Sequence, residues 1–90
     1  MNVEIISAKM QQDEDKHYLG STIFKFENQK SLYEITFSSK RGKEWDYSLS
    51  FAKESGSEEE MLLVDQRIEE DDELFDTLLD AALDTLNEDN

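Results

Sequence analysis

His17 is the only histidine of this 90-residue chain, and it is the first residue to consider for acid–base chemistry. A general base needs an orienting partner and a pocket, and no neighbour in the sequence singles out a partner for it. Four serines of the central region lie on strand-like segments and not on a strained turn after a strand: Ser38, Ser39, Ser48 and Ser50. The three glycines are isolated, so there is no glycine-rich phosphate loop. The sequence therefore predicts that the protein is not an enzyme and carries no cofactor.

Oxygen ligands for a hard cation are abundant, in acidic runs at residues 58–60 and 69–73. A calcium loop needs alternating ligands, a central glycine and a closing glutamate, and neither run has that pattern. We therefore expect weak cation condensation and no metal site.

A more regular set of carboxylates lies near the C-terminal end, at every fourth position: Asp72, Asp76, Asp80, Asp84 and Glu88. Residues four apart on an α-helix lie on one face and rise about 6 Å along the axis. No Lys or Arg falls between them to form the usual pairs at this spacing. These five residues are the predicted partner-binding residues.

Two features of this set are unfavourable for a helix. Aspartate is a poorer helix former than glutamate. Acids near the C-terminal end, such as Asp84, Glu88 and Asp89, oppose the helix dipole. A basic protein partner would offset both costs. The competing interpretation is that the acids only keep the protein soluble, and charge patterning does not decide between the two.

The net charge of −14 is unevenly distributed. Residues 1–53 hold eight basic and eight acidic side chains, whereas residues 54–90 hold one and fifteen. Phosphates and anionic lipids would be repelled, so we expect neither nucleic-acid nor membrane binding. The chain has no cysteine, which favours a cytoplasmic location, and its N-terminus resembles neither a signal peptide nor a membrane span.

The first half of the chain alternates apolar and polar residues as half-buried strands do. The alternation is clear over residues 18–26, 33–37 and 45–51, and an earlier run changes phase near Ile6, where we predict a β-bulge. Gly42 lies in a basic turn and can take the positive φ of a tight hairpin. The last two strands should therefore pair with their aromatic residues opposed.

The second half predicts one helix and leaves one segment ambiguous. From 72 to 87 the apolar residues repeat at helical spacing, and Asp71 or Asp72 can cap the first turn. Residues 61–68 bury Leu62, Val64 and Ile68 as a strand, or Met61, Val64 and Ile68 as a helix. The preceding Ser-Gly-Ser resembles a hairpin connection, so we favour a strand.

The predicted fold is a single α+β domain over residues 1–90. It is an antiparallel β-meander of four or five strands with one C-terminal amphipathic helix packed on one face. The helix would contribute Phe75, Leu78, Leu79, Ala82, Leu83 and Leu86 to the core. The facing sheet residues would be Phe24, Phe26, Tyr33, Ile35, Phe37, Trp45, Tyr47, Leu49 and Phe51.

Two functions fit these features. One is a small binding or regulatory protein that shows its carboxylate-lined helix to a basic partner, as an inhibitor, an antitoxin or an adaptor would, with carboxylates in place of nucleic-acid phosphates. The alternative is a self-associating structural domain, a homodimer whose acidic face serves only solubility. In that case Met61 and Leu63, exposed on an outer sheet strand, would form the interface.

Overall fold

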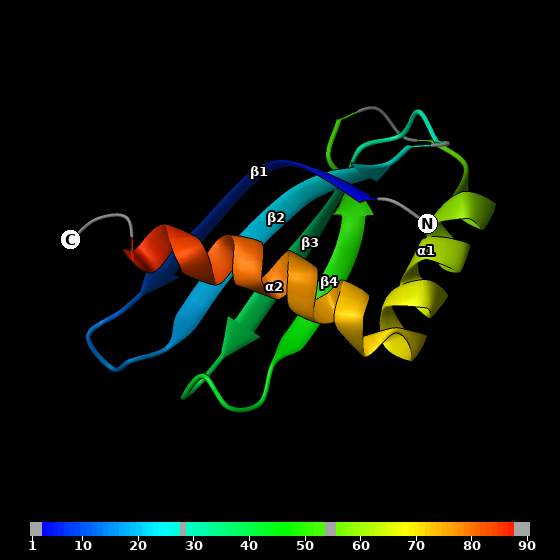
Figure 1. Ribbon diagram of the computed structural model, residues 1–90. Helices are drawn as coiled ribbons and strands as arrows, with labels where there is room; N and C mark the ends of the chain where they lie inside the picture. Colours follow the sequence, from blue (N-terminus) through cyan, green and yellow to red (C-terminus); the bar gives the residue numbers. More distant parts are fainter. Residues whose placement is uncertain (1–2, 28, 54–55, 88–90) are drawn as a thin grey trace.

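The computed structural model describes residues 3–27, 29–53 and 56–87. Four strands come first, β1 (Val3–Gln12), β2 (Tyr18–Phe26), β3 (Tyr33–Ser39) and β4 (Asp46–Phe51). Two helices follow, α1 (Glu58–Glu70) and α2 (Asp72–Asn87). Figure 1 shows α2 lying across the sheet, with α1 beside β4. The chain is an α+β fold, as the sequence predicts.

The strands form one antiparallel sheet in the order β1-β2-β3-β4, which confirms the predicted meander. The register of β1 against β2 shifts between Ile5 and Ser7, so the predicted bulge lies where the apolar phase changes. Between β3 and β4 the core residues are directly opposed, with Tyr33 facing Phe51 and Phe37 facing Tyr47. The period-two pattern therefore fixes both the strands and their register.

The connection between β3 and β4 spans residues 40–45 and is longer than a tight hairpin turn, but it has the positive φ predicted at Gly42. Gly42 has a φ of +79°, a conformation that side chains with a Cβ rarely adopt. Its amide donates a hydrogen bond of 2.8 Å to the Ser39 Oγ. Lys40, Arg41 and Lys43 are exposed around this glycine.

The preference for a strand at residues 61–68 is wrong, because this segment belongs to α1. The Ser57 side chain accepts a hydrogen bond from the Glu60 amide, and three glutamates occupy the first turn, where the helix dipole favours negative charge. The Ser-Gly-Ser segment thus ends in a helix cap and not in a hairpin. Val64 and Ile68 are buried, as the helical alternative requires.

The exposed side chains of α1 also differ from the strand interpretation. Leu62 and Leu63 are 68% and 64% exposed on a helix, and Met61 is half-buried. Met61 and Leu63 therefore do not form an outer sheet surface. Two helices, and not one, cover the sheet.

Helix α2 has the predicted bounds. Its cap is Asp71, whose Oδ1 accepts a hydrogen bond from the Leu74 amide at 3.2 Å. The same residue ends α1 by donating its backbone amide to the Arg67 carbonyl, so one residue separates the two helices. Leu78, Leu79 and Ala82 are buried on the face towards the sheet.

One face of the sheet, called the inner face below, carries the core. Helix α2 lies over β1 and β2, while α1 contacts β4 and α2. The Phe75 ring packs edge-on against Phe37 and Tyr47, with centroids 5.6 and 5.7 Å away. A buried hydrogen bond of 2.8 Å from the Thr22 Oγ1 to the Leu78 carbonyl joins β2 to α2. These contacts fix which face of α2 points outward.

Substitutions on the two faces of α2 should have opposite consequences. Leu79→Asp places an unpaired charge where only 7% of the side chain is exposed, and it should cost on the order of 3–5 kcal/mol of unfolding free energy. Asp80→Lys lies on the exposed face and should change that free energy by about 0.5 kcal/mol or less. Urea denaturation of both variants measures the difference, and equal losses would show that the helix faces are misassigned.

Candidate functional site: an acidic helix face

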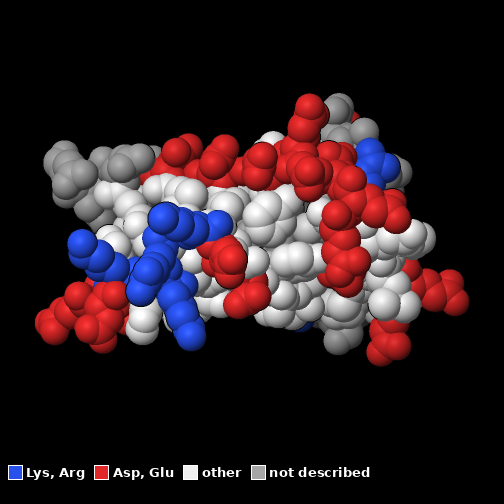
Figure 2. Space-filling view, turned by 90° about the horizontal axis from the view of Figure 1, so that it is seen from below, with Lys and Arg blue, Asp and Glu red and all other residues white. Residues whose placement is uncertain are grey.

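The predicted carboxylates lie together on the outward side of α2. Asp72, Asp76, Asp80 and Asp84 are all exposed, and their spacing places successive carboxylates about one helical turn apart. Glu88 lies outside the described residues. Figure 2 shows an almost continuous row of acidic side chains along one border of the molecule, over α2 and on towards α1. We call Asp72, Asp76, Asp80 and Asp84 the acidic face.

The fold brings no cation to the acidic face within the part of the chain that the structure describes. Ion pairs within that part join Lys25 to Glu4, Arg67 to Asp71 and His17 to Asp13, and none of them involves the acidic face. Arg67 is the one basic residue after position 53, and its Nε lies 3.6 Å from the Asp71 Oδ2. The last turn of α2 contains no basic residue to balance its dipole. Solvent and ions therefore screen these carboxylates.

The basic side chains lie elsewhere. Most of those visible in Figure 2 gather at the end of the molecule away from α1, apart from the acidic row. Acidic side chains lie beside these basic ones in the same view, in keeping with the balanced charge of residues 1–53.

Helix α1 adds carboxylates that the sequence analysis did not assign to a surface. Glu58, Glu59, Glu69 and Glu70 are exposed, while Asp65 is half-buried. Only Asp65 of these acids lies within residues 61–68, so a strand there would have given the other four no place on a common surface. The helical alternative for that segment was the available signal, since it separates Val64 and Ile68 from the acids around them.

Two of these acids lie close to a tyrosine of the sheet. The Tyr47 hydroxyl oxygen is buried and has no hydrogen-bond partner in good geometry among the described residues, although Asp65 and Glu69 lie near it. Burial raises the pKa of Tyr47 to about 12, and the two carboxylates contribute to that rise because they repel a phenolate. Burial also raises the pKa of Tyr33, with Glu60 adding repulsion. Helix α1 thus holds negative charge against β4.

His17 acquires a partner in the structure that the sequence did not indicate. Its Nδ1 lies 3.4 Å from the Asp13 Oδ2, and both side chains are more than half exposed, at 53% and 55%. The Asp13 Oδ1 accepts hydrogen bonds from the backbone amides of Asp15 and His17, both at 2.9 Å. Asp13 thus organises the turn between β1 and β2 as an Asx-type side-chain bond does.

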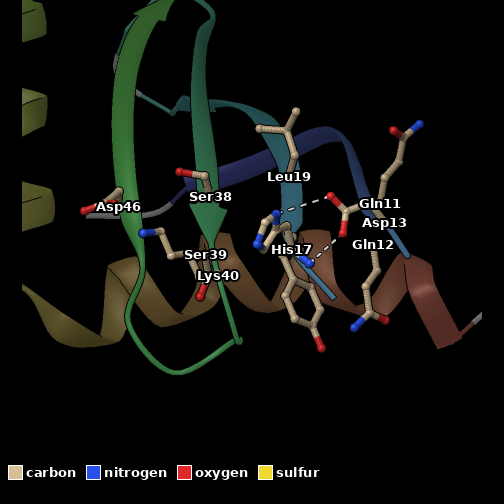
Figure 3. A pocket seen from close by; sticks show the side chains of 10 residues that line it. Gln11, Gln12, Asp13, His17, Leu19, Ser38, Ser39, Lys40 and Asp46 are labelled. Carbon is tan, nitrogen blue, oxygen red and sulfur yellow. Dashed lines mark hydrogen bonds and ion pairs between the residues drawn. The ribbon is translucent and has the colours of Figure 1, made fainter. Parts of the chain in front are cut away.

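The pair borders an open pocket of about 500 Å³ (Figure 3). Leu19, Ser38, Lys40 and Asp46 are among the other residues that line it. The exposure of both partners leaves their interaction in a high-dielectric setting, which provides little of the water exclusion that catalysis uses. The acidic face remains the stronger candidate for function.

Two further properties bear on the kind of site. Among the residues placed by the structure, no three His, Cys, Asp or Glu side chains gather closely enough to hold a metal ion. Within the same residues, neither helix has the length and apolar character needed to cross a membrane.

Comparison with known proteins gives no assignment. No protein-family model matches the chain, and no curated protein or solved structure matches it significantly.

Self-repulsion on the acidic face predicts a salt dependence. Raising the salt concentration from about 0.02 M to about 0.2 M shortens the Debye length and screens the carboxylates, so the melting temperature should rise. Asp76→Lys combined with Asp80→Lys should reduce that rise. Thermal denaturation followed by circular dichroism measures both, and a melting temperature that falls with salt would indicate stabilising ion pairs instead.

The raised pKa of Tyr47 predicts a loss of stability in alkali. The unfolded chain releases this proton near pH 10.0 and the folded chain near pH 12, so the folded state binds more protons in between. The stabilisation is complete below pH 10 and is lost as pH rises towards 12. Tyr47→Phe should lose less stability over this interval in urea denaturation. An identical alkaline loss in the variant would exclude Tyr47 as its source.

Proposed function

We propose that this chain is a non-enzymatic binding protein of the cytoplasm whose acidic face docks on a basic protein. The observation that carries the proposal is the uncompensated row of four exposed aspartates on α2, in a helix without a basic residue in its last turn. A solvated protein surface usually mixes both signs of charge. A basic partner would supply the cations that this surface lacks.

The rigidity of the acidic face supports this proposal. Its helix is anchored by buried Leu78, Leu79 and Ala82, and by the hydrogen bond from Thr22. The carboxylates thus start from a fixed backbone, so less conformational entropy is lost on association. An ordered row of negative charge can substitute for nucleic-acid phosphates on a basic protein. An inhibitor or antitoxin of a nucleic-acid-binding protein, or an adaptor, would use it in this way.

The alternative proposal is a homodimer whose acidic face serves only solubility. The observation that favours it is the pair Leu62 and Leu63, adjacent on α1 and both more than half exposed. Apolar self-association should persist at high salt, whereas docking through the acidic face should weaken steeply. Sedimentation at low and high salt, with Leu63→Glu as the variant, separates the two.

Charge reversal on the acidic face tests the first proposal. Asp76→Lys with Asp80→Lys should abolish capture of basic proteins from a cell extract at low salt, because it replaces two attractive charges by repulsive ones. Stability should stay the same or rise slightly, because both residues lie away from the core. Pull-down with identification of the captured proteins, beside thermal denaturation, measures the two effects.

A matched control has the same change of net charge elsewhere. Glu14 and Asp15 are exposed acids of the turn between β1 and β2. Glu14→Lys with Asp15→Lys should leave capture nearly intact. Equal loss in the two double variants would reduce the effect to net charge and contradict a defined binding face.

A further inference from the structure

The two edges of the sheet differ in how they are protected. Edge strands expose unpaired backbone groups, and proteins protect them with bulges, lysines, prolines or a covering element. The β1 edge has its bulge between Ile5 and Ser7, carries Lys9 and lies under α2. The β4 edge has a regular register, and β4 contains neither lysine nor proline.

The free backbone groups of β4 follow from its pairing with β3. The Ala52 amide donates to the Leu32 carbonyl at 2.9 Å, which makes this opposed pair a hydrogen-bonded one. Hydrogen-bonded pairs alternate along an antiparallel ladder, so Ser50 and Ser48 are bonded to β3 as well. The amides and carbonyls of Tyr47, Leu49 and Phe51 therefore point away from the sheet, and no hydrogen bond within the described ranges reaches them.

The side chains of β4 are also incompletely covered. On the neighbouring strand, Tyr33, Ile35 and Phe37 have no exposed area. Their partners Phe51, Leu49 and Tyr47 belong to the same inner face but are only half-buried, as is Trp45 just before the strand. An apolar border about one strand wide is thus left open along the edge. A further strand would cover it.

Helix α1 packs against the inner face of the sheet and contacts β4. Its Val64 and Arg67 border a pocket together with Phe26 of β2, and its Glu60 approaches Tyr33 of β3. Asp65 and Glu69, near the Tyr47 hydroxyl, are its acids closest to β4. Every second side chain of an added strand would point towards these carboxylates.

Charge selects between two occupants of this edge. A second copy would bring its own Asp65 and Glu69 against those of the first, and each copy carries a net charge of −14. An extended segment with Lys or Arg at alternate positions would instead meet opposite charges. Main-chain hydrogen bonds would supply affinity and the carboxylates would supply specificity.

We propose that the β4 edge accepts an extended basic segment of a protein partner as a fifth strand of the sheet. The basic character of the segment rests on the proposed function, whereas the open edge does not depend on it. The acidic face of α2 and the β4 edge would then be two contact regions for one basic partner.

A short peptide that alternates lysine with valine is the probe. At saturating peptide, hydrogen exchange of the Tyr47, Leu49 and Phe51 amides should slow by about tenfold or more, because each gains a hydrogen bond. The same peptide with every backbone amide N-methylated keeps the charge but removes all of its amide donors. It should leave the exchange of these three amides unchanged.

Two double variants, each of which removes two negative charges, show which carboxylates contribute to peptide binding. Asp65→Asn with Glu69→Gln should weaken peptide binding by about tenfold, and Asp76→Asn with Asp80→Asn should change it by about twofold or less. Three outcomes would overturn the proposal. The two double variants could weaken peptide binding equally, or the lysine–valine peptide could leave the exchange rates of the Tyr47, Leu49 and Phe51 amides unchanged. The third is protection of these amides that grows with protein concentration in the absence of peptide. Failure of the proposed function would be seen in a different experiment. In that case, Asp76→Lys with Asp80→Lys would leave partner capture unaffected.

Discussion

The burial of one apolar sheet face is the constraint on which the rest of the structure depends. The meander places Phe24, Tyr33, Ile35 and Phe37 on that face with no exposed area, and only the helices can cover them. Leu78 and Ala82 of α2 are fully buried against them. The hydrogen bond from the Thr22 side chain to the Leu78 carbonyl holds the helix in position over β2. Covering this face therefore sets the rotation of α2 about its axis.

The rotation of α2 places Asp72, Asp76, Asp80 and Asp84 in solvent, but it does not require them to be acidic. Lysine or glutamine would suit the same positions and have higher helix propensity. The carboxylates add self-repulsion, and near the helix C-terminus they oppose the dipole. Folding gains nothing evident from these carboxylates, which is the reason for proposing that they serve association. The β4 edge shows a related feature, since a half-buried apolar border and free amides also add nothing to the isolated fold.

Much of the fold can be predicted from local periodicity, because the sheet has one buried face and α2 has a full amphipathic repeat. The bulge near Ile6, the positive φ at Gly42 and the bounds of α2 all follow from patterns within a few residues. The helical state of α1 could not be predicted from its apolar period, because a short apolar run fits both a strand and a helix. The overlooked local signal is Ser57 followed three residues later by Glu60, a spacing typical of a helix cap, and the Glu60 amide does donate to the Ser57 side chain.

The site divides in the same way. The acidic face is a local helical pattern and could be predicted, except for Glu88, which lies outside the described residues. The approach of Asp65 and Glu69 to Tyr47 joins distant segments, and so does the open edge of β4. Both features depend on how α1 packs, and this packing could not be predicted while residues 61–68 fitted either a strand or a helix. Asp13 beside His17 is a contact within a turn, and no sequence pattern distinguishes Asp13 from the neighbouring acids as the partner of His17.

If the charge of the acidic face serves association and not folding, its removal should not destabilise the isolated chain. The most direct test is the unfolding free energy, at low salt, of a variant that combines Asp76→Asn, Asp80→Asn and Asp84→Asn. Asparagine keeps the size and the approximate helix propensity of aspartate while removing its charge. The account predicts an unfolding free energy equal to or higher than that of the unmodified chain. A loss of more than about 1 kcal/mol, beyond the usual range for surface substitutions, would show that the fold requires these charges.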